Sequence, residues 1–174
     1  MSETLTPELA RRRMIGLMDA VGAEYKIYAH RPIRNYDDAE LARQESAFIG
    51  TESKSLVLKS GEDVIVYVTL AGRRVDFKAV RTHLGGPKPK IMTDEELWSR
   101  FAAEPGAAYP FGFDENVRTY VDPDLYGEEW LLLSLVLPTE TVQIRGGDIR
   151  KVFAHVANPV EEVTTFNQAA SLPS

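Results

Sequence analysis

Lys54 is a residue whose type and position could serve a reaction. It begins the apolar run Lys54–Lys59, "KSLVLK", so its ammonium group is expected at the rim of a buried sheet. A lysine held there can act as a fixed donor to a carbonyl or phosphate oxygen. The simpler alternative is a lysine at a strand edge whose stem lies on apolar surface, and from this residue alone that alternative is favoured.

The loop Glu104–Phe113, "EPGAAYPFGF", is the second candidate. Pro105 and Pro110 stiffen the chain and remove two N–H donors, whereas Gly106 and Gly112 let the backbone approach a ligand closely. The N–H groups between them could bind a carbonyl oxygen or an oxyanion. A plain connection between a helix and a strand fits the same residues equally well, so both interpretations stay open.

Other common chemistries lack their residues. The chain has no cysteine, and its histidines, His30, His83 and His155, lie at no metal-binding spacing. No GxSxG motif or phosphate-binding glycine loop occurs, so we expect no metal and no cofactor. His83 is expected at the surface of a helix. His30 could line a pocket, although a structural role is favoured.

The acidic stretch Asp122–Glu129 has a partial likeness to a calcium loop. Tyr126 and Leu133 stand where the fifth and twelfth positions of such a loop need oxygen ligands. We therefore interpret the stretch as an acidic turn.

Composition indicates an ordinary globular protein. The 174 residues are 44% hydrophobic and 26% charged, with a net charge of -6. This charge argues against a protein that coats nucleic acid, although Arg11–Arg13, Arg73–Arg74 and Lys88–Lys90 could form local basic patches. Neither a signal peptide nor a membrane span is evident, and we expect a cytoplasmic protein.

The expected elements alternate irregularly between helix and strand. Capping signals at Thr6, Asp37, Asp76 and Thr93 predict four helices, and a short fifth one follows Gly147. Strands are expected over residues 24–30, 53–59, 64–70, 88–92, 117–121, 130–137 and 141–145. The strand over 130–137, "WLLLSLVL", is apolar throughout and is therefore expected to be central. These elements predict an α+β domain with a mixed, curved sheet.

Six stretches, in order and at matching spacing over residues 24–156, resemble the YbaK/ProX family, the free-standing relatives of the editing domain of bacterial prolyl-tRNA synthetases. They are His30-x-Pro32, "SKSLVLK", "RVDFKAVRTHLG", Gly106-x-x-x-Pro110-Phe-Gly112, "TYVDPDL" and "VQIRGGDIRKV". The resemblance implies a partly barrel-like sheet flanked by helices. It also implies one domain over residues 1–157, with an N-terminal helix extension at 1–23 and a polar tail at 158–174.

The activity implied by the resemblance is hydrolysis, in trans, of the ester in a mischarged tRNA. Lys54 would be the catalytic residue and would position the terminal nucleotide and the ester, while the loop backbone would line the aminoacyl pocket. An aminoacyl ester is already activated, so placing a water or the vicinal hydroxyl beside the carbonyl, with donors for the developing oxyanion, could suffice without a protein nucleophile. The 3' end of aminoacyl-tRNA is the implied partner, with an aminoacyl-tRNA synthetase or an elongation factor as further candidates.

Two residues depart from the family pattern. Tyr109 stands where a small residue is common, and Leu137 replaces a histidine before Pro138. The expected substrate-binding set is Gly106, Ala107, Ala108, Tyr109, Pro110, Phe111, Gly112, His30 and Leu137. A non-catalytic module that binds an amino acid, a nucleotide or a peptide is the alternative function, and an oligomerising scaffold is a third.

Overall fold

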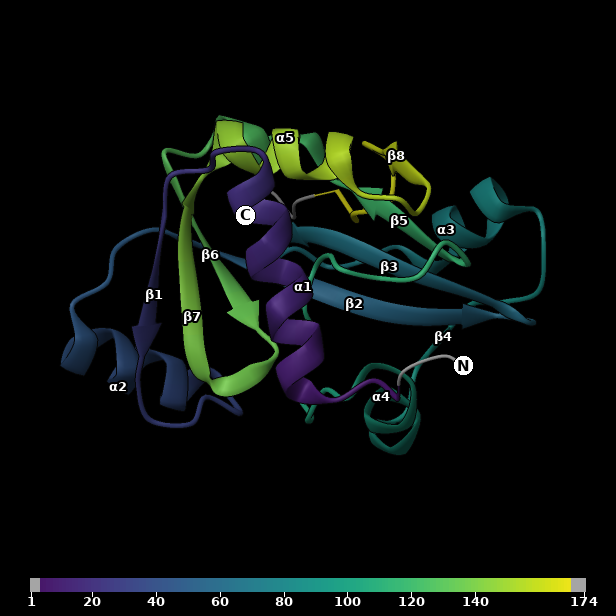
Figure 1. Ribbon diagram of the computed structural model, residues 1–174. Coiled ribbons are helices and arrows are strands. Elements are labelled where there is room, and N and C mark those ends of the chain that lie inside the picture. Colours follow the sequence, from purple (N-terminus) through teal and green to yellow (C-terminus); the bar gives the residue numbers. More distant parts are fainter. Residues whose placement is uncertain (1–3, 170–174) are drawn as a thin grey trace, which may run out of the picture.

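Strand β2 (Thr51–Ser60) is the longest strand and joins the two halves of the sheet. The computed structural model describes residues 4–169, and Figure 1 shows how their elements are arranged. The other strands are β1 (Tyr25–Ala29), β3 (Asp63–Leu70), β4 (Lys90–Ile91), β5 (Val117–Val121), β6 (Trp130–Leu135), β7 (Leu137–Arg145) and β8 (Val160–Glu162). The helices are α1 (Pro7–Ala20), α2 (Tyr36–Ser46), α3 (Phe77–Leu84), α4 (Asp94–Phe101), α5 (Gly146–His155) and the 3-10 helix η1 (Pro123–Gly127).

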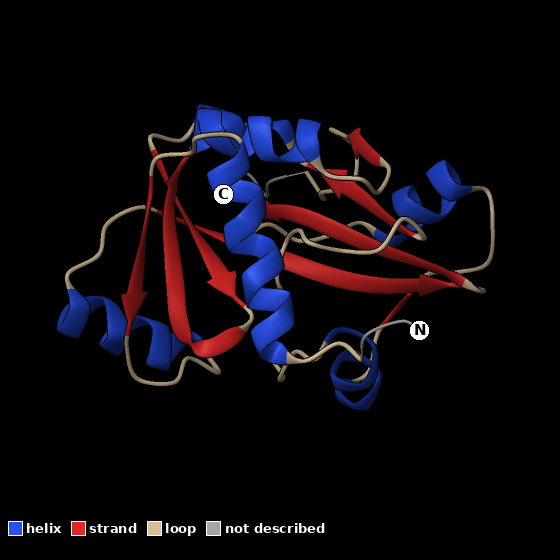
Figure 2. Ribbon diagram, viewed as in Figure 1, coloured by secondary structure: helices blue, strands red, loops and turns tan. Residues whose placement is uncertain are grey.

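The sheet is mixed and unclosed. Its strand order is β1-β7-β6-β2-β3-β5-β8, with β4 paired to β2 beside this path. The pairs β2–β6, β3–β5 and β5–β8 are parallel, and the other pairs are antiparallel. Helices lie around the outside of the sheet (Figure 2). The predicted α+β class with a mixed sheet flanked by helices is confirmed.

The β2–β3 hairpin has the predicted position. Ser60 pairs with Asp63, so the connection is the two residues Gly61 and Glu62. Gly61 has a φ of 62°, a conformation that glycine adopts without steric cost. Local turn chemistry therefore fixes the register of the strand that carries Lys54.

Most of the predicted helix starts are also correct. Thr6, Asp76 and Thr93 each accept a hydrogen bond from a backbone N–H in the first turn, and Thr93 forms a capping box with Glu96. The start predicted near Asp37 is wrong by two residues. Asn35 is the cap of α2, because its side-chain oxygen accepts the N–H of Asp38 at 2.9 Å.

Strand β7 begins four residues earlier than expected. Leu135 of β6 pairs with Leu137, so only Val136 separates the two strands, and Val136 has a φ of 73°. This reversal places Leu137 and Pro138 inside the sheet. Strand β6 is interior in the strand order, as predicted.

Two apolar clusters lie on opposite faces of β2 and β3. Met14 and Met18 of α1, which crosses the middle of the molecule in Figure 1, pack with Val57 and Leu133 in the larger cluster. The smaller cluster contains Leu58, Tyr67, Val80 of α3 and Phe166. Because side chains alternate along a strand, β2 supplies both clusters.

The segment expected as a polar tail from residue 158 packs on the domain as far as it is described. Strand β8 pairs in parallel with β5, and Phe166 is fully buried against Tyr67. The Gln168 N–H donates to the Arg74 carbonyl at 2.7 Å. The burial of Phe166 and these backbone pairings account for the difference, and both depend on residues distant in the sequence.

Candidate active site

An unpaired stretch of the β2 edge forms one side of the candidate site. On the edge away from β3, β2 pairs with β6 at Thr51–Glu52 and with β4 at Leu58–Lys59. The carbonyl of Val57 accepts from Met92 on this edge, and Ser55, two residues earlier, directs its backbone in the same direction. The backbone N–H and C=O of Ser55 therefore face the gap between β6 and β4.

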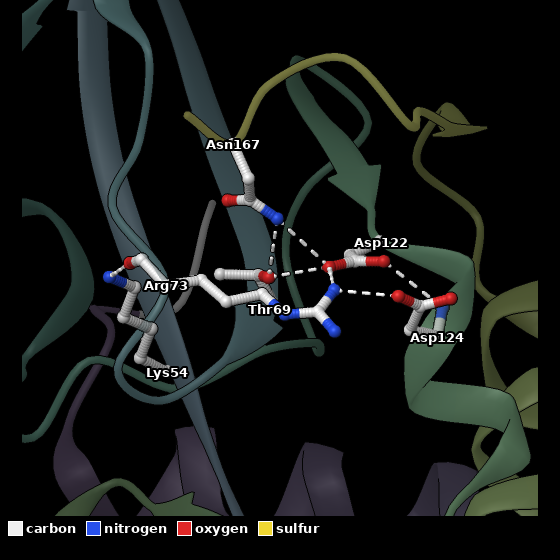
Figure 3. A network of polar contacts seen from close by, with 6 residues as sticks. All are labelled: Lys54, Thr69, Arg73, Asp122, Asp124 and Asn167. Carbon is white, nitrogen blue, oxygen red and sulfur yellow. Dashed lines mark hydrogen bonds and ion pairs between the residues drawn. The ribbon is translucent and has the colours of Figure 1, made fainter. Parts of the chain in front are cut away.

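Lys54 lies beside this gap. Its ammonium group donates to the carbonyl of Arg73, in the loop after β3 (Figure 3). Among residues 4–169 no carboxylate lies within ion-pair distance of it. Burial lowers the pKa of Lys54 from the ordinary value of 10.5. The Arg73 carbonyl takes one N–H donor of the ammonium and leaves two others for a ligand.

The start of the loop after α4 faces the same gap. Gly106 has a φ of 78°, and a Cβ there would lie 3.4 Å from the Arg34 carbonyl oxygen. Ala107 is held at both ends, because its N–H donates to Glu104 and its carbonyl accepts from Ser134 Oγ at 3.2 Å. Within the described chain, the N–H groups of Gly106 and Ala108 donate to no protein acceptor. The loop thus presents two free donors on a fixed backbone.

Two adjacent cavities meet at Ser53, Gly106 and Ser134, which line both of them. The large cavity, of about 350 Å³, is also lined by Lys54, Leu56, Ile91, Met92, Leu97 and Ala108. The small cavity, of about 140 Å³, is also lined by His30, Ile33, Phe48, Leu132, Leu137, Pro138 and Thr141. The structure thus brings Lys54 and the loop together, although Gly106 lies 52 positions after Lys54 in the sequence.

The later part of the loop, residues 109–112, does not form the expected pocket wall. Tyr109 is 2% exposed, and its hydroxyl donates to the Phe101 carbonyl at 2.9 Å. Phe111 is buried edge-on against Phe153, and Gly112 packs against α1. None of these residues, nor Pro110, lines either cavity. Burial of the aromatic rings in the core explains the difference, and Tyr109 therefore leaves both cavities unfilled.

His30 and Leu137 both line the small cavity. Nδ1 of His30 lies 2.7 Å from the Arg31 carbonyl oxygen, and Nε2 lies 2.7 Å from Thr141 Oγ. Both ring nitrogens are therefore engaged, which favours a structural role for the imidazole. Leu137 brings an apolar side chain from the first residue of β7.

A buried carboxylate was missed by the sequence analysis. Asp122, interpreted as part of an acidic turn, is 4% exposed and directly follows β5. Its Oδ2 accepts from Thr69 Oγ at 2.7 Å, from Arg73 Nη1 at 2.7 Å and from Asn167 Nδ2 at 3.0 Å (Figure 3). The sequence does contain a signal for this carboxylate, which is an Asp placed directly between a strand and Pro123. A polar group at the end of a buried strand needs hydrogen-bond partners, so a buried network could have been expected there.

Some side chains of the expected basic patches are paired with carboxylates. Arg11 binds Glu140 through two hydrogen bonds, and Arg73 binds Asp122 and Asp124.

No group of three acidic or histidine side chains in the described range could hold a metal ion. No helix among residues 4–169 is long and apolar enough to cross a membrane. The polar groups at the cavities are the Lys54 ammonium, backbone N–H groups, and the hydroxyl and carboxylate groups of lining residues.

The fold is shared with solved structures of similar size. A crystal structure of a proposed trans-editing enzyme for prolyl tRNA synthetase superimposes with a TM-score of 0.68 at 21% identity, covering 95% of this chain and 99% of that one. A crystal structure of a hypothetical protein gives a TM-score of 0.70 at 14% identity, covering 90% and 99%. The chain therefore shares the α+β fold of these two structures.

The sequence comparisons identify the family. The multifunctional Ser/Thr-tRNA deacylase ProXp-y of Escherichia coli strain K12 is 23% identical over 130 residues, which are 72% of this chain and 77% of that protein. The family model of the aminoacyl-tRNA editing domain matches residues 30–152. The chain belongs to the aminoacyl-tRNA editing domain family, which confirms the resemblance seen in the sequence.

Proposed function

We propose that this protein is a trans-editing aminoacyl-tRNA deacylase, which hydrolyses the ester between a wrong amino acid and tRNA. The observation that carries the proposal is the large cavity. Lys54 lines it together with Gly106 and Ala108, in a chain of the aminoacyl-tRNA editing family.

In this mechanism the ester carbonyl lies between Lys54 and the loop. A water molecule, placed beside the vicinal hydroxyl of the terminal ribose, adds to the carbonyl carbon and gives up a proton, and negative charge develops on the carbonyl oxygen. In this proposal the N–H groups of Gly106 and Ala108 and the ammonium of Lys54 stabilise that charge. The bond from carbon to the ribose oxygen then breaks, the ribose oxygen takes a proton, and the amino acid leaves.

The small cavity is the proposed acyl pocket. Its volume, about 140 Å³, suits a short side chain, and the Thr141 and Ser53 hydroxyls lie in its lining. Glu52 and Glu140 also line it, but the Glu52 carboxylate is paired with Arg43 and the Glu140 carboxylate with Arg11. The pocket therefore selects by size and hydrogen bonding more than by charge. We propose a seryl or threonyl ester as the first substrate to test, in line with the name of the E. coli relative.

The partner in this proposal is the 3' end of an aminoacyl-tRNA, delivered in the cytoplasm by a synthetase or an elongation factor. The proposed deacylase domain continues past residue 157, because β8 pairs with β5 and Phe166 is buried, and residues 1–23, which include α1, are its N-terminal extension. The net charge of -6 suits a protein that grips only the end of the tRNA.

A panel of mischarged tRNAs tests the proposal. Wild-type protein should release the amino acid from at least one of them, and Lys54→Ala should lose most of this activity. If every ester survives a high protein concentration, the deacylase proposal fails. Saturable binding of an aminoacyl ester without turnover would instead support the binding module.

A further inference from the structure

The buried carboxylate Asp122 lies outside both cavities, yet it is connected to Lys54 by two routes. The first route is the loop after β3. Lys54 donates to the backbone carbonyl of Arg73, and the guanidinium of the same Arg73 binds Asp122 Oδ2 at 2.7 Å. The carboxylate therefore clamps the residue whose carbonyl holds the ammonium.

The second route runs across the sheet. Lys54 pairs with Thr69 of β3, and paired residues place their side chains on the same face. Thr69 Oγ donates to Asp122 Oδ2 at 2.7 Å. The carboxylate itself is fixed by its backbone, because the Asp122 N–H donates to the Val68 carbonyl at 2.9 Å.

Asn167 completes the set from the segment after β8. Its Nδ2 donates to Asp122 Oδ2 at 3.0 Å and to Thr69 Oγ at 3.1 Å. The backbone next to Asn167 is also held in place, since the backbone N–H of Asp76 donates to the Phe166 carbonyl at 2.6 Å. Figure 3 shows the six side chains of this network, which are those of Lys54, Thr69, Arg73, Asp122, Asp124 and Asn167.

Charge and hydrogen bonding together hold the Asp122 carboxylate in the network. Asp122 accepts four hydrogen bonds, because Oδ1 also receives the N–H of Asp124 at 3.0 Å. Its side chain is 5% exposed, so the ion pair with Arg73 is shielded from water on the carboxylate side. Asp124, the other partner of Arg73, is 63% exposed and contributes less.

We propose that Asp122 is a positioning residue for Lys54, acting through Arg73 and Thr69, and that Asn167 supports it. This inference rests on the proposed function for its meaning in catalysis. Asp122 holds the Arg73 carbonyl at the place where it restrains the Lys54 ammonium at the edge of the large cavity. The segment after β8 is thereby part of the support of the active site, although the family model ends at residue 152.

The first test measures Lys54 itself and needs no activity. The pH titration of the Lys54 Cε resonance is followed by NMR in wild type and in Asp122→Asn, with Lys54→Met to assign the signal. Releasing the Arg73 loop should let the ammonium return to water, so the pKa of Lys54 should rise toward that of an exposed lysine. Glu161→Gln, which removes a surface carboxylate paired with His83, is the matched control and should leave the titration unchanged.

The second test is a double-mutant cycle on deacylation. Asp122→Asn should lower kcat/KM by about tenfold to 100-fold, the range expected when a reacting group is misplaced by about 1 Å. In the Lys54→Ala background the same change should cost almost nothing more, because the effect acts through the lysine. A purely structural role would give equal losses in both backgrounds and would overturn the proposal.

Asn167→Ala keeps the proposal testable if Asp122→Asn unfolds. It removes two donors at the periphery and leaves the ion pair of Asp122 with Arg73 in place. The Lys54 titration should shift in the same direction by a smaller amount. If it stays at the wild-type position in every folded variant, the positioning role is refuted, whether or not the protein proves to be a deacylase.

Discussion

Replacing Lys54 by methionine should separate activity from stability. Methionine keeps most of the length and apolar volume of the stem but removes the ammonium of a residue that lines the large cavity. Removal of one donor to a developing oxyanion typically lowers kcat by about 10²–10³, which corresponds to about 2.7–4 kcal/mol. We expect a loss of this size in the release of amino acid from the best mischarged tRNA.

The stability of the same variant should change little. The bond to the Arg73 carbonyl is lost, and a hydrogen bond from a charged donor contributes about 1.5–3 kcal/mol. In wild type, the cost of burying the ammonium offsets the stabilisation from this hydrogen bond. The lowered pKa of Lys54 reflects this cost, because the charged form is less favourable in the fold than in water. The free energy of unfolding of Lys54→Met should therefore lie within about 1 kcal/mol of wild type at pH 7.

The pH dependence has a definite sign. Between the lowered pKa of folded Lys54 and 10.5, the unfolded chain binds more protons, so the stability of wild type rises with pH in this window. Lys54→Met lacks this rise. Any advantage in Tm that the variant has at neutral pH should shrink as the pH approaches 10.5, which thermal denaturation over a pH series would measure.

Lys59→Met is the matched control, because Lys59 lies on the same strand but pairs with Glu96 and lines neither cavity. It should retain wild-type turnover. The reasoning is refuted if Lys54→Met keeps turnover within about threefold of wild type, since that ratio is far below the loss of one oxyanion donor. Equal losses in the two variants would point to a general effect of charge on tRNA binding.

Three further changes address the loop and the acyl pocket. Gly106→Ala places a side chain at a φ of 78°, so it should lower the free energy of unfolding, measured by urea denaturation, by about 1–2 kcal/mol and should also lower turnover. Gly147→Ala, which has open space around it, should change neither the stability nor the turnover. Tyr109→Phe removes the buried bond to Phe101 and should cost about 1–3 kcal/mol of stability, while kcat/KM should stay at the wild-type value because the ring faces the core. Leu137→Ala enlarges the small cavity and should shift the preference among mischarged tRNAs toward larger amino acids, and an unchanged ranking would contradict the assignment of this cavity as the acyl pocket.

Local signals made the hairpin, three helix caps and the central strand predictable. The nearness of Lys54 to the loop at Gly106 depended on the family resemblance, because nothing in either stretch alone indicates the other. The orientation of Tyr109 could not be predicted, since an aromatic ring in a proline-rich loop fits a core and a pocket wall equally well. Strand β8 was missed because three residues of an edge strand carry little signal of their own and pair in parallel with β5, distant in the sequence.

The two cavities draw on different parts of the chain, and this division affects how the protein can change. Apart from the shared Ser53, Gly106 and Ser134, the small cavity is built mainly by β6, β7 and the segments around α2, whereas β2, β4 and α4 contribute to the large one. If the small cavity is the acyl pocket, as we propose, substitutions in β7 would alter the accepted amino acid while Lys54 and its support stay in place. Substrate choice and reactivity would then be separately evolvable, and a library confined to the small cavity would explore one without disturbing the other.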